Sequence, residues 1–116
     1  MKLTLTVILG FFMIIGGLNH FINPDMYLPF IPSFLPKAIV NLAAGVIELA
    51  LGIGVLAPRS RNLSTKAIFL LMCIFLPIHV WDIFREDPAI GTHTAALVRL
   101  PVQFVLIYWS WYISIG

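Results

Sequence analysis

Four apolar stretches dominate the sequence, and each is long enough to cross a lipid bilayer as a helix. They cover residues 3–23, 37–57, 67–84 and 94–115. A helix rises 1.5 Å per residue, so about 20 residues span roughly 30 Å of hydrocarbon. Breaks rich in proline or glycine separate the stretches. We therefore expect one all-α domain, residues 1–116, folded as an integral membrane four-helix bundle.

Composition narrows the possible function classes. Apolar residues make up 60% of the chain and charged residues 10%, whereas soluble domains have about 45–50% and ~25%. These values argue against a soluble enzyme, a disordered chain and a nucleic-acid binder, and they make the lipid bilayer the first expected partner. The single cysteine, Cys73, excludes a disulfide within the chain and a CxxC redox pair.

Loop charges predict the orientation in the membrane. Lys2, Arg59, Arg61 and Lys66 fall on one side with no acid among them, whereas Asp25, Lys37, Arg85, Glu86, Asp87 and Arg99 fall on the other. The positive-inside rule then places both termini in the cytoplasm. The first stretch resembles a signal peptide only in that Lys2 precedes it, and without an A-x-A site we expect it to be retained. The expected location is the cytoplasmic (inner) membrane of a bacterium.

The second stretch carries an acid near mid-membrane. Asn41, Gly45, Glu48 and Gly52 are spaced by four, three and four residues, which puts them on one helical stripe. The glycines would let another helix approach closely. A carboxylate at this depth is costly and normally faces the bundle interior with a partner. Glu48 is either a protonated residue that hydrogen-bonds a neighbouring helix or a proton carrier in a functional site.

Further polar residues fall in the same half of the membrane, which is the outer half in the expected orientation. They are His20, Asn41, His79, Asp82, Arg99 and Gln103. We expect His20, Glu48, His79 and Arg99 to converge on one polar cavity, with Arg99 long enough to reach toward Glu48. The alternatives are histidines that are solvated or cap helix ends, an Asp82 that meets water or Arg85, and an Arg99 that snorkels to lipid headgroups.

The His79–Asp82 pair shares a helix face because its members are three residues apart. The simpler interpretation is a carboxylate that orients an imidazole. A metal site with His20 as third ligand is the weaker alternative, so we expect no metal. The sequence has no strong haem or nucleotide motif either, which leaves the cofactor unknown and a quinone possible.

The segment after the first stretch is rich in proline and aromatic residues. Residues 24–36 contain four prolines together with Tyr27, Phe30 and Phe34. Irregular backbone cannot lie exposed to lipid at depth, so we expect this segment at the membrane interface, partly covering the bundle. It is either a lid over the polar residues, with Tyr27 as a ligand contact, or a plain connector.

These residues carry a family resemblance. The stretches GGLNHFINPDMYLPFIPSFLP, IELALGIGVLAPRSR and RLPVQFVLIYWSW resemble the DoxX-like family of small four-helix membrane proteins over nearly the whole chain. The positions that match its motifs are His20, Pro24, Tyr27, Glu48, Pro58, Arg59, Arg61, Arg99, Pro101 and Gln103. The resemblance implies a role near quinone or sulfur redox chemistry, or in assembly. With only Cys73 present, chemistry that needs a thiol pair does not carry over.

Two functions therefore compete, and whether the chain is an enzyme stays open. The first is a redox-linked subunit that binds a quinone or small sulfur species, with Arg99 and a histidine polarising an oxygen and Glu48 carrying a proton. The second is an accessory subunit or assembly factor whose glycine-lined face binds other membrane proteins or a second copy of the chain. A small transporter or lipid-binding protein is a weaker third hypothesis, because four short spans offer little machinery for alternating access.

The expected topology can be tested by cysteine labelling. Ser64→Cys should react only from the cytoplasmic side and Thr92→Cys only from the opposite side, because the two positions lie in loops of opposite predicted location. Membrane-impermeant maleimide on intact and on permeabilised cells measures this. Labelling of Thr92→Cys from the cytoplasm alone would contradict the topology.

Overall fold

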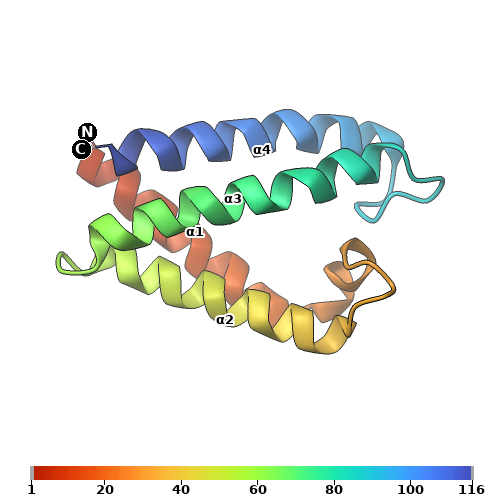
Figure 1. Cartoon of the computed structure of the whole chain (residues 1–116), viewed down its shortest axis with the longest axis horizontal. Helices are drawn as coiled ribbons and strands as arrows, with labels where there is room; N and C mark the ends of the chain where they lie inside the picture. The colour runs from red at the N-terminus through yellow and green to blue at the C-terminus, as the bar shows by residue number, and fades with distance from the viewer. Residues whose placement is uncertain (1, 116) are drawn as a thin grey trace.

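A computed structural model describes residues 2–115, and in this range the chain is helical with no β-strand. The long helices are α1 (Lys2–Ile22), α2 (Lys37–Leu56), α3 (Arg61–Ile83) and α4 (His93–Ser114). Two 3-10 turns, η1 (Pro24–Met26) and η2 (Leu28–Phe30), lie between α1 and α2. Both termini and the α2–α3 turn lie at one end of the bundle, and the other two connections lie at the opposite end (Figure 1). The four-helix architecture was predicted correctly.

Helix bounds agree with the expected spans except at the start of α3. That helix begins at Arg61, six residues before the expected start, because the prediction began at the first residue of the apolar run. Side chains at the polar start of α3 bind carbonyls at the end of α2. The Arg61 side chain donates to the carbonyls of Val55 and Leu56 at 2.8 and 3.1 Å, and Ser60 Oγ donates to the Gly54 carbonyl at 2.6 Å. These bonds satisfy carbonyls that a helix end leaves free.

The helices pack mainly as two antiparallel pairs, α1 with α2 and α3 with α4. Glycines allow the close contact in the first pair. A Cβ added at Gly17 would lie 2.9 Å from the Gly45 carbonyl oxygen, and one added at Gly52 would lie 2.8 Å from the Gly10 carbonyl oxygen. The seven-residue spacing of the glycines on each helix therefore matches across the pair. The expectation that Gly45 and Gly52 permit close helix approach is confirmed.

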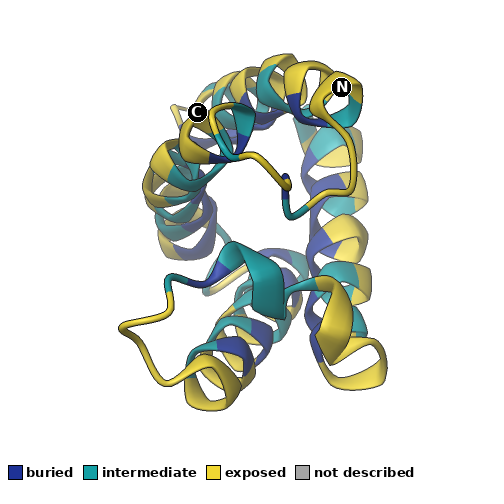
Figure 2. Ribbon diagram, turned by 90° about the vertical axis from the view of Figure 1, so that its right-hand side faces the viewer, coloured by how far each residue is buried: buried dark blue, intermediate teal, exposed yellow. Residues whose placement is uncertain are grey.

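Buried side chains of both kinds, apolar and polar, line the inside of the bundle. Large apolar side chains cover the outside, while buried positions face the centre of the ring of helices (Figure 2). The apolar core lies toward the end with the termini and is formed by Leu9, Met13, Val55, Ile68, Met72, Leu106 and Ile113. His20, Asn41 and Asp82 are buried in the half nearer the other end. All four helices are long and apolar enough to cross a membrane.

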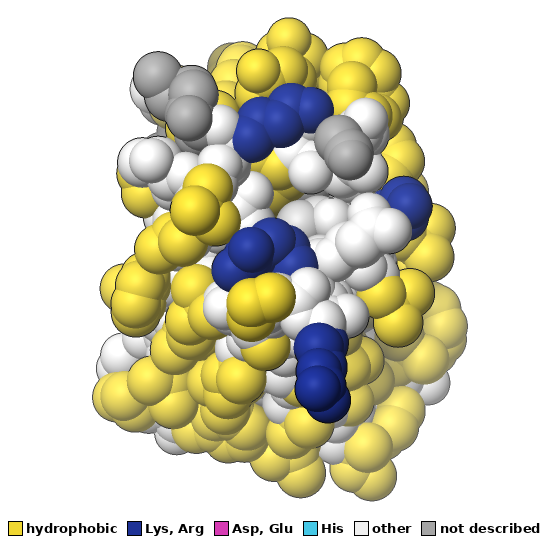
Figure 3. Space-filling view, turned by 90° about the vertical axis from the view of Figure 1, so that its left-hand side faces the viewer, with side chains coloured by type: hydrophobic (Ala, Val, Ile, Leu, Met, Phe, Trp, Pro, Cys, Tyr) yellow, Lys and Arg dark blue, Asp and Glu magenta, His cyan; other side chains and the backbone are white. Residues whose placement is uncertain are grey.

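The end that carries the termini is basic. Its face shows lysine and arginine side chains and no aspartate or glutamate (Figure 3). This agrees with the placement of Lys2, Arg59, Arg61 and Lys66 at one end in the sequence. Ser64 is buried here, whereas Asn62 is exposed. Asn62→Cys is therefore the better labelling position for the topology experiment.

The glycine contacts predict a stability difference between neighbouring positions. Gly17→Ala should lower the free energy of unfolding by about 1–3 kcal/mol, the usual cost of overpacking, because its Cβ would lie 2.7 Å from the Leu49 backbone nitrogen. Gly16→Ala is the milder comparison and should cost less, since its Cβ would meet the Glu48 side chain at 3.2 Å rather than the backbone of α2. Thermal unfolding in detergent compares the two. Equal stability of both variants would contradict the proposed role of Gly17.

Candidate functional site

The centre of the polar region is a hydrogen-bonded group on α1 and α2. His20 Nε2 lies 2.5 Å from Glu48 Oε2, and His20 Nδ1 lies 2.7 Å from Asn41 Oδ1. Asn41 Nδ2 donates to the His20 carbonyl at 2.9 Å, which fixes the amide with its oxygen toward the ring. Nδ1 must therefore be the donor to Asn41. The other ring nitrogen then shares one proton with Glu48, either as imidazolium and carboxylate or as imidazole and carboxylic acid.

Small residues make room for this group. A Cβ at Gly45 would lie 2.8 Å from the His20 Cβ, and one at Gly16 would lie 3.2 Å from Glu48 Oε1. The stripe that carries Asn41, Gly45 and Glu48 thus fits around the histidine of the neighbouring helix. The side chains of His20 and Glu48 are only 7% and 12% exposed. The expected buried partner of Glu48 is present, and it is a histidine.

The segment between α1 and α2 covers both helix pairs. The Tyr27 ring stacks on His20 with centroids 3.7 Å apart, and the Phe30 ring meets His79 edge-on at 5.6 Å. Tyr27 Oη accepts a 2.8 Å hydrogen bond from Asn19 Nδ2. Tyr27 and Phe30 are three residues apart, so one short piece of backbone lies against a histidine from each pair. Arg85 Nη1 fastens this piece by donating to the Pro29 carbonyl at 2.7 Å.

Asp82 meets Arg85, as one of the two sequence interpretations had it, and it also binds the loop that follows α3. Its carboxylate accepts hydrogen bonds from the backbone nitrogens of Ala89 and Ile90 at 2.6 and 3.3 Å, and it lies 3.6 Å from Arg85 Nη1. The carboxylate therefore organises the loop between α3 and α4. The interpretation that Asp82 orients the His79 imidazole is wrong, because its oxygens are occupied by the loop backbone and His79 Nδ1 has no hydrogen-bond partner among the described residues.

Three buried polar atoms on α3 and α4 lack hydrogen-bond partners within residues 2–115. They are His79 Nδ1, Arg99 Nη1 and Gln103 Oε1. Gln103 is fully buried, and its Nε2 donates to the Met72 carbonyl at 2.6 Å. Arg99 is half-buried on α4. The α3–α4 pair thus carries a cationic donor, a fully buried acceptor and an imidazole nitrogen.

Arg99 does not form the expected contact with Glu48. No ion pair joins Arg99 to an acid in the part of the chain that the structure describes. His20 and Glu48 meet directly, whereas His79 and Arg99 lie on the other helix pair. Convergence of these four side chains on one polar cavity therefore stays a prediction: His20 meets Glu48 on one pair, His79 and Arg99 lie on the other, and the 24–36 segment contacts both histidines.

Some contributors were missed from the sequence. Asn19, Phe30 and Arg85 were not among the candidate site residues, although each holds or forms part of the covering segment. Their signal in the sequence was weak, because an asparagine beside a histidine and an arginine in a loop are common.

Metal chemistry receives no support from geometry: within residues 2–115, no three His, Cys, Asp or Glu side chains are grouped as metal ligands. The Cys73 thiol is free and half-buried.

Comparison with known proteins yields one family. A family model described as "Domain of unknown function (DUF8561)" matches residues 9–114. The match includes α2, α3 and α4, α1 from residue 9 onward, and every residue of the polar region. No curated protein and no solved structure matches the chain.

The His20–Glu48 contact predicts strong energetic coupling. In a double-mutant cycle with His20→Leu and Glu48→Gln, the coupling free energy should be about 0.5–3 kcal/mol, the range for residues in direct contact. Thermal or denaturant unfolding of the four proteins in one detergent measures it. Asn19→Leu with Glu48→Gln is the control pair, because Asn19 bonds Tyr27 and not the acid. Additive effects in the His20 cycle would mean that the short contact contributes nothing.

Proposed function

We propose that this chain, which belongs to the DUF8561 family, is an integral membrane, redox-linked subunit that binds a quinone or a small sulfur species. The apolar exterior supports the membrane placement, because the interior holds roughly as many polar as apolar residues. Such a distribution suits a chain whose surroundings are hydrocarbon. The four long helices and the basic end with both termini fit the orientation with the termini in the cytoplasm of a bacterium.

The observation that carries the ligand proposal is the set of three unpartnered polar atoms on α3 and α4. Leaving a buried polar group unpaired costs about 1–3 kcal/mol, and more for a charged group. A ligand oxygen would accept from Arg99 Nη1, and a ligand hydroxyl would donate to Gln103 Oε1. A quinone has carbonyl oxygens when oxidised and hydroxyls when reduced, so its two forms use both kinds of partner. An oxyanion of sulfur would use the arginine alone.

The His20–Glu48 pair would serve the proton side of this chemistry. Reduction of a quinone takes up two electrons and two protons. The pair shares a proton over 2.5 Å, so it can supply one of the two protons with little movement of heavy atoms, and water would supply the second by reprotonating the pair. The electrons would come from a redox partner subunit. Tyr27 and Asn41 would position His20, the first by stacking and the second by its hydrogen bond.

The resemblance to DoxX-like proteins supports the same proposal. The positions that carry it include His20 and Glu48 of the α1–α2 pair, Arg99 and Gln103 of α4, and Tyr27, which stacks on His20. A role as accessory subunit or assembly factor is the second candidate. The glycine stripe that suggested it is used inside the chain, between α1 and α2, so the ligand-binding role is the better supported of the two.

The proposal predicts a ligand-dependent gain in stability. A ligand present at about a hundred times its dissociation constant should add ~2.7 kcal/mol to the wild-type chain. Thermal unfolding in detergent with ubiquinone-1, menadione and thiosulfate tests this. Arg99→Gln should lose the gain by removing the charged donor, and Glu48→Gln should lose it by removing the shared proton while keeping a nearly isosteric side chain. Arg59→Gln, an exposed arginine at the other end, is the control and should keep the full response.

The outcomes distinguish a ligand-binding subunit from an accessory subunit or assembly factor. A response kept by Arg59→Gln and lost in Arg99→Gln supports a ligand site on α3 and α4. No response to any of the three compounds in the wild type would overturn the ligand proposal and favour the accessory role. In that case co-purification of partner subunits with the tagged chain becomes the deciding measurement.

A further inference from the structure

A shallow groove lies between α1 and α4 near the basic end of the bundle, away from the polar region. It has a volume of about 320 Å³ and is lined by Leu5, Val105, Tyr108, Trp109 and Tyr112. The four α4 residues are spaced by three, one and three, so they form one face of that helix. Direct contact between α1 and α4 is sparse compared with either antiparallel pair, which leaves this face open to the surroundings.

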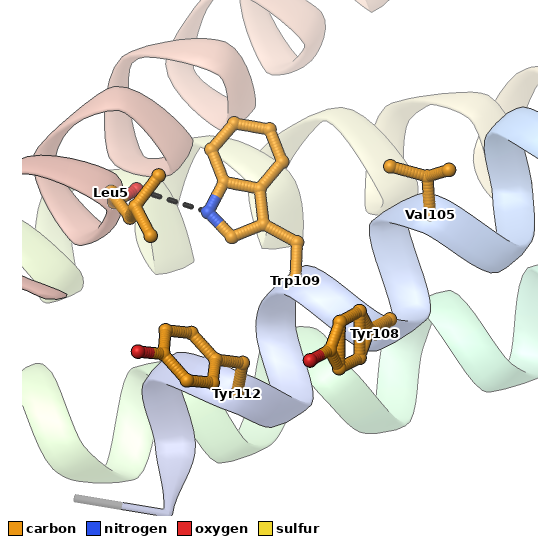
Figure 4. Close-up of a pocket in the computed structure, with 5 residues that line it drawn as sticks. All are labelled: Leu5, Val105, Tyr108, Trp109 and Tyr112. Atoms are coloured by element: carbon orange, nitrogen blue, oxygen red, sulfur yellow. Dashed lines mark hydrogen bonds between the residues drawn. The ribbon is translucent and has the colours of Figure 1, made fainter.

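The lining offers apolar surface to an occupant. Trp109 Nε1 donates to the Leu5 carbonyl at 3.2 Å, so the one polar atom of the indole is turned into the protein (Figure 4). Tyr108 is stacked with Trp111 at 5.8 Å and lies 6.3 Å from Tyr112, centroid to centroid. An extended hydrocarbon chain fits such a lining, because it can contact the rings along its length without leaving a polar group unpaired.

The Lys2 ammonium marks one end of the groove. Lys2 Nζ lies 4.9 Å from the centre of the Tyr112 ring, in a cation–π contact that holds the ammonium beside the lining. The same end of the bundle presents basic and no acidic side chains (Figure 3). A nearby hollow lined by Pro58, Arg61 and Asn62 is a poorer anion site, because the Arg61 guanidinium already donates to the carbonyls that end α2.

From this arrangement we infer that the groove binds one acyl chain of an anionic phospholipid, with the lipid phosphate at Lys2. The inference rests on the membrane placement proposed above and is independent of the quinone or sulfur ligand. The apolar, aromatic lining selects the hydrocarbon chain, and the ammonium at its end selects a negative headgroup over a zwitterionic one. A lysine near an anionic membrane surface adds about 1 kcal/mol, which corresponds to an approximately five-fold preference.

Native mass spectrometry of the full chain from detergent micelles tests the inference. The probes are dioleoyl phosphatidylglycerol and dioleoyl phosphatidylcholine, which share acyl chains and differ in headgroup charge. The wild type should retain the anionic lipid about five-fold better. Lys2→Gln should abolish the preference. Arg59→Gln, which removes the same charge from the same end but away from the groove, should keep it.

A second pair of variants tests the groove itself. Val105→Trp should fill it and release both lipids, whereas Val102→Trp, at another exposed valine of α4 outside the lining, should not. Equal loss in Lys2→Gln and Arg59→Gln, or no loss in Val105→Trp, would overturn the inference in favour of a diffuse basic surface. Recovery of the wild-type chain in the soluble fraction without detergent would instead contradict the membrane placement.

Discussion

The close approach of α1 and α2 is the contact on which the polar region depends. Gly17 against Gly45 and Gly10 against Gly52 bring the backbones together, and the same approach puts His20 in reach of Asn41 and Glu48. A carboxylate in the middle of an apolar helix is tolerable only with a partner. Here the partner comes from the neighbouring helix, and it can reach the acid because no side chain stands between the backbones. The packing of α1 against α2 therefore also brings His20 and Glu48 together.

The helices and the helix face that depends on residue spacing were predictable from the sequence. Span length predicted the four helices, because the apolar runs are bounded by prolines and glycines that end a helix. The four-three-four spacing of Asn41, Gly45, Glu48 and Gly52 predicted a shared face, and that face packs on α1. The start of α3 was missed because hydropathy detects only the apolar part of a helix. Its polar first turn is helical for another reason, since Arg61 and Ser60 close the end of α2.

The depth of each residue along its helix was not enough to predict which side chain contacts Glu48. His20 and Arg99 were both expected in the outer half, and the longer arginine was expected to reach toward Glu48. The direction in which each side chain leaves its helix decided otherwise, because His20 faces Gly45 on α2 while Arg99 belongs to α4 in the other pair. Asp82 shows a related limit. Its oxygens accept hydrogen bonds from backbone nitrogens of a loop. Such contacts cannot be predicted from the spacing of residue types, because every residue type except proline has a backbone N–H.

The two helix pairs differ in how far their buried polar groups are hydrogen-bonded, and this difference affects what a bound ligand would do. Within residues 2–115, the α1–α2 pair satisfies its buried side-chain groups, whereas the α3–α4 pair retains three buried atoms without a hydrogen-bond partner, on His79, Arg99 and Gln103. Contact between the pairs is weaker than contact within them, so a ligand held by α3 and α4 that also exchanges a proton with the His20–Glu48 pair would join the less tightly packed halves. The 24–36 segment, which touches a histidine of each pair and is fastened by Arg85, already joins them in this way. A ligand that bridged the two pairs would therefore stabilise the same contact that this segment makes.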